Sequence, residues 1–143
     1  MYSYFHFRES KLDRDRLKEL CDKWRKNDDK VFLEEDVDKP FLLVHITKFQ
    51  LDLMHRYGKT TCLLDATYKT TKYALPLFFI ACHTNAGYRV LAQFVVERET
   101  THCVQEALQI IRSLVSDFKP TAWIVDFSEA EIAAIEGAFP GTL

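Results

Sequence analysis

Three runs of β-branched and apolar residues follow one another in the middle of the chain, and this succession restricts the fold more than any other feature. The runs cover residues 60–66, 75–84 and 88–97. The turn-forming residues 85–87 make up the whole connection between the second and third runs. Strand candidates joined by such short connections predict an antiparallel meander.

The third run also shows the alternation that is typical of a half-buried strand. Its alternating apolar residues are Val90, Ala92, Phe94 and Val96. We therefore expect these four side chains on the buried face of the sheet, with the polar residues between them on the other face.

The region after the meander predicts a helix, a short strand and a second helix. An uninterrupted apolar stripe marks the first helix and consists of Val104, Ala107, Leu108, Ile111, Leu114, Val115 and Phe118. Thr100 or Thr101 caps this helix, and Lys119-Pro120 ends it. Residues 121–125 predict the strand. The capping box Ser128-Glu-Ala-Glu131 then opens a helix that ends near Gly137.

This order of elements predicts an α/β fold. A meander followed by a helical crossover to a parallel strand requires a mixed sheet, and such a crossover is expected to be right-handed. The chain should therefore form one domain around residues 40–143.

The N-terminal part, residues 1–39, is expected to form a helix and a charged linker outside that domain. Leu17, Leu20, Cys21 and Trp24 share one face of a predicted helix over residues 10–29. The helix is either a solvated lead into the domain or a DNA-binding arm, and the charge-rich residues 27–39 follow it as a linker.

A strand and a helix are expected at the start of the domain. Residues 41–46 predict the strand. Thr47 can cap the helix that follows, and Gly58 stops it.

Composition restricts the function classes and the compartment. The net charge is −2, so any DNA contact must come from a local patch. None of the four cysteines forms a C-x-x-C pair, and Cys62 and Cys82 lie in apolar runs that indicate buried structural thiols. Neither a signal peptide nor a membrane-spanning run is evident, so we expect a soluble, reduced, intracellular protein in the nucleus or cytoplasm.

Two acidic residues end predicted strands. Asp65 lies near the end of the first run, and Asp126 directly follows the strand after the crossover. If these strands are parallel neighbours, both carboxylates emerge at one edge of the sheet. Carboxylates at such a position suit Mg²⁺ or Mn²⁺. An aspartate at a strand end is also a common turn or capping residue, and that alternative stays open.

An ordered set of short motifs resembles the core of the MULE (Mutator-like element) transposases. The motifs are Leu63-Leu-Asp65-Ala-Thr-Tyr68-Lys, Leu75-Pro-Leu77, Gly87-Tyr, Glu99-Thr100-Thr, Asp126-Phe-Ser-Glu-Ala130-Glu, Ala134-Ile135 and Phe139-Pro140. The resemblance covers about residues 40–143 and is strongest with domesticated animal relatives that carry SWIM-type zinc fingers.

This resemblance implies an RNase H-like fold with a triad of acids of the DDE type. Asp65 would be the first acid and Asp126 the second, and both would bind Mg²⁺ or Mn²⁺. The third would lie beyond Leu143, so the chain is expected to be C-terminally truncated. Residues 83–85, His-Thr-Asn, stand where transposases often carry an acid, which departs from the family pattern.

Basic and aromatic residues flank Asp65 in the sequence. Lys59, Lys69 and Lys72, with Tyr68, could form a backbone-phosphate patch for DNA. The alternative is a solvated hairpin loop.

Two functions remain for a chain of this kind. One is a divalent-metal-dependent core for DNA strand cleavage and transfer, inactive in the truncated chain. The other is a domesticated, non-catalytic nuclear module that binds DNA or protein partners. A partial gene product without an independent role is a further alternative. Truncation would leave one sheet edge uncovered, which predicts self-association.

Overall fold

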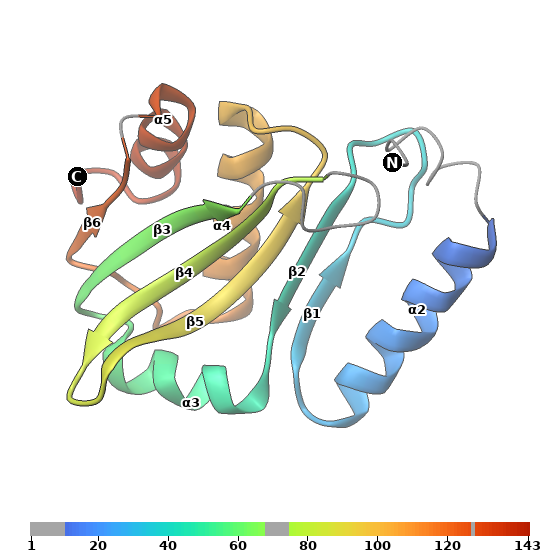
Figure 1. Cartoon of the computed structure of the whole chain (residues 1–143), viewed down its shortest axis with the longest axis horizontal. Helices are drawn as coiled ribbons and strands as arrows, with labels where there is room; N and C mark the ends of the chain where they lie inside the picture. The colour runs from blue at the N-terminus through green and yellow to red at the C-terminus, as the bar shows by residue number, and fades with distance from the viewer. Residues whose placement is uncertain (1–10, 68–74, 127) are drawn as a thin grey trace.

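A mixed sheet of six strands in the order β1-β2-β5-β4-β3-β6 forms the centre of the described protein, which the computed structural model covers over residues 11–67, 75–126 and 128–143 (Figure 1). The elements, in chain order, are α2 (Lys11–Lys26), β1 (Lys30–Leu33), β2 (Leu42–Ile46), α3 (Lys48–Tyr57), β3 (Thr61–Thr67), β4 (Leu77–Thr84), β5 (Gly87–Val96), α4 (Thr101–Leu114), β6 (Ala122–Ile124) and α5 (Glu129–Ala138).

The predicted meander is confirmed as β3, β4 and β5, which pair in antiparallel fashion. The expected alternation along β5 is wrong at one place. A β-bulge shifts the register so that Ile80 pairs with Ala92 while Ala81 pairs with Val90, which leaves Leu91 as the extra residue. As a result Leu91 and Ala92 are both fully buried, and Val90 is exposed.

The predicted crossover is also confirmed. The chain leaves β5, forms α4 and returns as β6, which pairs with β3 in parallel. Thr100 caps α4 by accepting a hydrogen bond from the Cys103 amide at 3.3 Å. The helix ends at Leu114, earlier than the apolar stripe predicts, because Val115 and Phe118 fill the core from the loop after it.

The main core lies between one face of the sheet and the helices α4 and α5 (Figure 1). Alternate residues of each strand enter it, including Leu42, Val44 and Ile46 of β2. Leu108 and Ile111 of α4 are fully buried against them. The buried side chains, which alternate along each strand, thus pack against the apolar stripe of α4. Burial of these apolar side chains stabilises the packing of the helix on the sheet.

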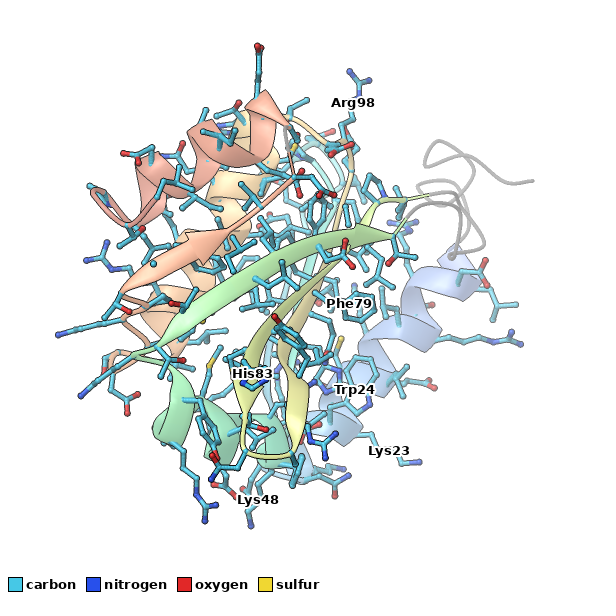
Figure 2. The ribbon with its side chains drawn as sticks, turned by 60° about the vertical axis from the view of Figure 1, so that its left-hand side comes forward. Lys23, Trp24, Lys48, Phe79, His83 and Arg98 are labelled. Atoms are coloured by element: carbon cyan, nitrogen blue, oxygen red, sulfur yellow. The ribbon has the colours of Figure 1, made fainter. Side chains whose placement is uncertain are left out.

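The N-terminal helix packs on the opposite face of the sheet. Leu17 of α2 and Leu43 of β2 contact a second, smaller cluster around Phe41 and Leu75. Trp24 stacks on the His45 ring with centroids 3.9 Å apart and lies on the side of α2 that faces the sheet (Figure 2). The helix therefore packs on the sheet through one face, while most of its residues are exposed, and a DNA-binding role for it stays a prediction.

The expectation of a linker over residues 27–39 is wrong. Residues Lys30–Leu33 form β1, which pairs with β2 in antiparallel fashion. The strand β1 is only partly buried, and charged residues flank it. The sequence of this region therefore indicated a linker instead of a strand. The boundary expected between residues 39 and 40 therefore falls inside a β-hairpin.

The architecture is mixed α/β and consistent with an RNase H-like core to which α2 and the β1–β2 hairpin are added. None of the helices in the described ranges is long and apolar enough to cross a membrane.

Candidate carboxylate site at the ends of β3 and β6

The parallel pairing of β3 with β6 brings the two predicted acids to the same level of the sheet. Cys62 pairs with Trp123, and Leu63 pairs with Ile124. Asp65 and Asp126 each lie two residues beyond the last pair, Leu63 with Ile124, although β6 itself ends at Ile124. Both acids therefore lie at the carboxyl ends of the two strands, and both act electrostatically on Glu131. Both are exposed to solvent.

The local sequence explains why both side chains reach solvent there. In β3 the buried residues are Cys62 and Leu64, so the alternation turns Asp65 to the other face. Asp126 follows the last residue of β6 and precedes Ser128, whose hydroxyl caps α5 by accepting a hydrogen bond from the Glu131 amide at 3.4 Å. The strand end and the helix start together fix the place of Asp126.

Two further acids, Glu131 and Glu99, lie at this end of the sheet, and the sequence analysis did not assign them to the site. Glu131 lies in the first turn of α5, with 4% of its surface exposed. Burial raises the pKa of its carboxyl group, and the negative charges of Glu99, Asp126 and Asp65 raise it further, while a hydrogen bond with Ser128 lowers it. The four acids are therefore close enough to interact electrostatically.

Oxygen donors of this kind fit Mg²⁺ or Mn²⁺, because hard divalent cations prefer carboxylates. Two of the soft donors, Cys62 and Cys82, face each other across β3 and β4 and are fully buried. Among the described residues no three His, Cys, Asp or Glu side chains are gathered as a preformed metal cluster. This end of the sheet thus carries two exposed carboxylates, Asp65 and Asp126, and a third, buried acid, Glu131, lies near them.

The basic residues expected beside Asp65 are not gathered there in the described part of the chain. Lys59 precedes the first residue of β3, whereas Asp65 is the fifth residue of that strand. Six residues of extended chain separate them by roughly 20 Å. Tyr68, Lys69 and Lys72 lie outside the described residues.

A different basic residue lies at the acidic end. β3 and β5 are both antiparallel to β4, so their carboxyl ends lie on the same side of the sheet. Arg98 follows β5 at that end, and its side chain is 77% exposed. Figure 2 shows Arg98 at the opposite end of the molecule from Lys48 and His83. The only sequence signal for Arg98 was its position just after the third strand.

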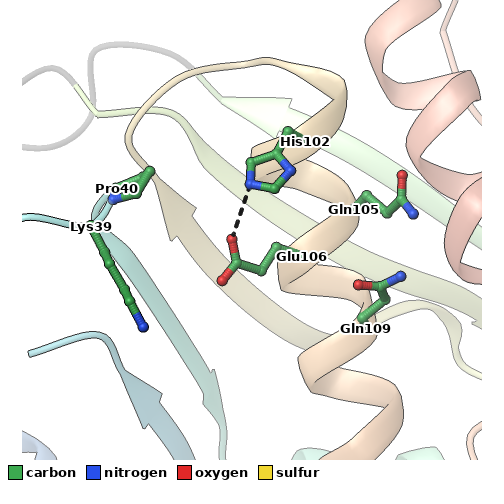
Figure 3. Close-up of a pocket in the computed structure, with 6 residues that line it drawn as sticks. All are labelled: Lys39, Pro40, His102, Gln105, Glu106 and Gln109. Atoms are coloured by element: carbon green, nitrogen blue, oxygen red, sulfur yellow. Dashed lines mark ion pairs between the residues drawn. The ribbon is translucent and has the colours of Figure 1, made fainter. Parts of the chain in front are cut away.

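A polar groove of about 510 Å³ lies elsewhere, between α4 and the segment that leads into β2 (Figure 3). Its lining residues are Lys39, Pro40, His102, Gln105, Glu106 and Gln109. His102 Nε2 and Glu106 Oε2 form an ion pair at 3.7 Å across one turn of α4. Neither Asp65 nor Asp126 lines this groove, so it is separate from the carboxylate edge.

The thiols behave as the sequence predicts. All four cysteines are free and buried. Burial raises the pKa of Cys62 to about 12, with a smaller contribution from Cys82 opposite it. A thiol with so high a pKa carries almost no thiolate at neutral pH and is a poor nucleophile or metal ligand.

Comparison with known proteins identifies the family. No curated protein and no solved structure matches the chain. Residues 61–143 match the MULE transposase domain, a shorter range than the resemblance over residues 40–143 indicated. The matched range begins at β3 and includes every strand and helix that forms the carboxylate edge. The chain belongs to the MULE transposase domain family.

Proposed function

We propose that the carboxyl ends of β3 and β6 form the divalent-cation site of a transposase-derived core for DNA strand cleavage and transfer. The observation that carries this proposal is the parallel register of β3 with β6, in which Leu63 pairs with Ile124, two residues before Asp65 and Asp126 respectively. Asp65 lies within β3, and Asp126 lies between the end of β6 and the capping Ser128 of α5, so ordered elements adjoin both acids. The family match over residues 61–143 supports the same assignment.

In this proposal Asp65 and Asp126 hold the cation at the edge of the sheet. When bound, a cation of this type activates the attacking oxygen and stabilises the leaving oxygen of a phosphodiester. The protein's part is to hold the two carboxylates at the ends of β3 and β6, where both are exposed to solvent.

DNA phosphates would approach from the same end, where the described acids Asp65, Asp126, Glu99 and Glu131 lie. Arg98 is a described basic residue that lies at this end and is open to solvent. We assign it a backbone-phosphate contact, which carries no sequence preference. Lys59 remains a candidate for a phosphate contact only at the far end of β3, and roles for Tyr68, Lys69 and Lys72 stay predictions.

The test is a titration of the chain with Mn²⁺, followed by electron paramagnetic resonance of the free ion. Asp65→Asn combined with Asp126→Asn should abolish binding with little loss of fold, because both changed side chains are exposed. Asp52→Asn, which removes an exposed acid from α3, is the matched control and should bind normally. Equal binding by the double variant and the control would overturn the site assignment.

A non-catalytic nuclear module that binds DNA or protein partners is the second candidate. The observation in its favour is that the described residues hold no preformed cluster of three metal-binding side chains. DNA binding measured in excess chelator separates the two functions. Binding that persists without divalent cations, and that Arg98→Ala weakens while Lys48→Ala does not, would favour the non-catalytic module.

A further inference from the structure

One face of the sheet is left open over several strands by the described helices. The helices α4 and α5 cover the other face. On the open side α2 packs next to β1, and its Trp24 covers the sheet at His45 of β2. Figure 1 shows β3, β4 and β5 with none of the helices of the described ranges in front of them. Among the described elements, none therefore blocks access to this part of the sheet.

Apolar side chains cross this face in a single row. Ile124 of β6 pairs with Leu63 of β3. Leu63 pairs with Ala81 of β4, which pairs in turn with Val90 of β5. The β-bulge at Leu91 turns Val90 away from the core and so completes the row. Contiguous apolar residues of this kind, with Ile124 53% and Val90 37% exposed, typically mark a surface that binds a partner or ligand.

Aromatic rings lie on both sides of this row. Phe79, two residues before Ala81, is the cross-strand partner of Asp65, so this ring and the first acid share one face. On the other side of the row Tyr88 pairs with His83 and is 61% exposed. The two rings meet edge to face, with centroids 5.2 Å apart. Exposed rings of this kind suit nucleobases, which stack on aromatic side chains whatever the base.

Positive charge is found at both ends of the face. Lys59 and Lys119 are exposed and lie just before β3 and β6, and the Lys119 amide donates a hydrogen bond at 3.0 Å to the carbonyl of the residue before Lys59. Asp117, an acid that Lys59 influences, is paired with His55 at 2.7 Å. At the other end, Arg98 and the proposed cation supply positive charge beside the acids. Phosphates can therefore be held at each end of the apolar row.

We propose that this open sheet face binds a DNA strand whose bases are unpaired and leads it to Asp65. The face consists of Leu63, Phe79, Ala81, Tyr88, Val90 and Ile124. The rings of Phe79 and Tyr88 stack on bases, while the lysines contact phosphates. Duplex DNA fits less well, because its bases are stacked on one another and offer no free surface to the rings. This inference rests on the proposed function for the choice of DNA as the substrate.

The experiment measures, by fluorescence anisotropy with Mg²⁺ present, the affinity of the full chain for an oligothymidylate of about 16 nucleotides and for the matching duplex. The single strand should bind more tightly. Phe79→Leu combined with Tyr88→Leu removes both rings and keeps the side chains apolar. This ring variant should lose at least about fivefold in affinity for the single strand, with little change for the duplex.

Two further variants make the test specific. Phe49→Leu is the matched control, because it removes a 68% exposed ring from α3, outside the open sheet face, and should change neither affinity. Tyr88→Leu alone repeats the test at an exposed position, and circular dichroism establishes that each variant is folded.

The phosphate contacts have a readout of their own. Lys59→Ala with Lys119→Ala should weaken single-strand binding and lower the slope of log affinity against log salt by about 0.7 for each lysine. The ring variant should keep the slope of the unsubstituted chain, because stacking releases no counterions.

The inference is overturned if the ring variant binds the single strand as Phe49→Leu does, or if the unsubstituted chain prefers the duplex or binds no single strand. Loss of self-association in the ring variant, measured by light scattering, with unchanged DNA binding would assign the face to a second copy of the chain. If Mn²⁺ binding requires Asp65 and Asp126 but the rings have no effect, the face falls and the cation site stands. If the chain binds no Mn²⁺ but the ring variant loses the single strand, the cation site falls and the face stands.

Discussion

Individual acids were predictable from the sequence only where the backbone alone determines their place. Asp65 and Asp126 end predicted strands, and parallel neighbours bring such ends together. Glu131 was not recognised, because the capping pattern places it in a first helical turn without telling which way that turn faces. Its burial depends on how α5 packs, which is a tertiary property.

The raised pKa of Glu131 predicts a pH dependence of stability. A folded-state pKa above the ordinary value of 4.5 means that folding favours the protonated form. The contribution of this group to stability is therefore fully present below pH 4.5 and is lost as the pH rises through the folded-state value. Glu131→Gln has no such loss, so its melting temperature relative to the unsubstituted chain should increase from pH 4 to pH 8.

Differential scanning calorimetry without divalent cations measures this difference. Glu129→Gln is the control, and its melting temperature relative to the unsubstituted chain should change less over the same range. A constant difference for Glu131→Gln across pH 4–8 would show that Glu131 has the same pKa folded and unfolded.

At the scale of elements, the α4 stripe and the meander were predictable because each repeats a clear period over many residues. The strand β1 was not, since it has four residues, only partial burial and charged flanks. The bulge in β5 was also missed, because no glycine marks Leu91 as an extra residue. Short elements and local irregularities depend on pairing partners that the local sequence does not contain.

The contact between α2 and the sheet depends on Trp24. This ring stacks on His45 at 3.9 Å, and His45 Nε2 lies 2.8 Å from Asp29 Oδ2. Asp29 Oδ1 in turn accepts a hydrogen bond from the Lys48 amide at the start of α3. Trp24→Ala should therefore destabilise the chain by about 1–3 kcal/mol, through lost burial and a loosened polar network.

Urea denaturation measures the effect of Trp24→Ala. The neighbouring exposed Lys23 provides the control, since Lys23→Ala should change stability by less than about 0.5 kcal/mol. Equal denaturation midpoints for the two variants would mean that α2 contributes little to the stability of the described fold.

For the whole molecule, the two edges of the sheet differ in their protection. The edge strand β1 is short and is followed by Glu34, Glu35 and Asp36, whose charges discourage pairing with another chain. The edge strand β6 is covered in part, because the Trp123 amide donates a hydrogen bond to the Thr142 carbonyl at 2.9 Å. Ile124 on β6 remains 53% exposed.

The β6 edge is less well protected than the β1 edge. Self-association therefore stays a prediction, and we expect it to occur through β6. The chain should form dimers or larger species at micromolar concentration, and Ile124→Lys should shift it towards the monomer, because a charge at a sheet edge opposes pairing. Size-exclusion chromatography with light scattering measures the mass. A clean monomer for the unsubstituted chain would contradict the prediction.

The order of the elements, taken over the whole chain, predicted the α/β class and the parallel pairing of β3 with β6. It could not supply the burial of Glu131 or the position of Arg98. Those positions arise from packing between segments far apart in the sequence.

The most direct test of the central claim is anomalous X-ray diffraction from crystals of the chain soaked in Mn²⁺. The account predicts an anomalous peak between the carboxylates of Asp65 and Asp126, within ordinary metal–oxygen distance of both, and no such peak in crystals of the Asp65→Asn, Asp126→Asn variant. Ordered Mn²⁺ found only at other positions, such as the His102–Glu106 pair, would contradict it.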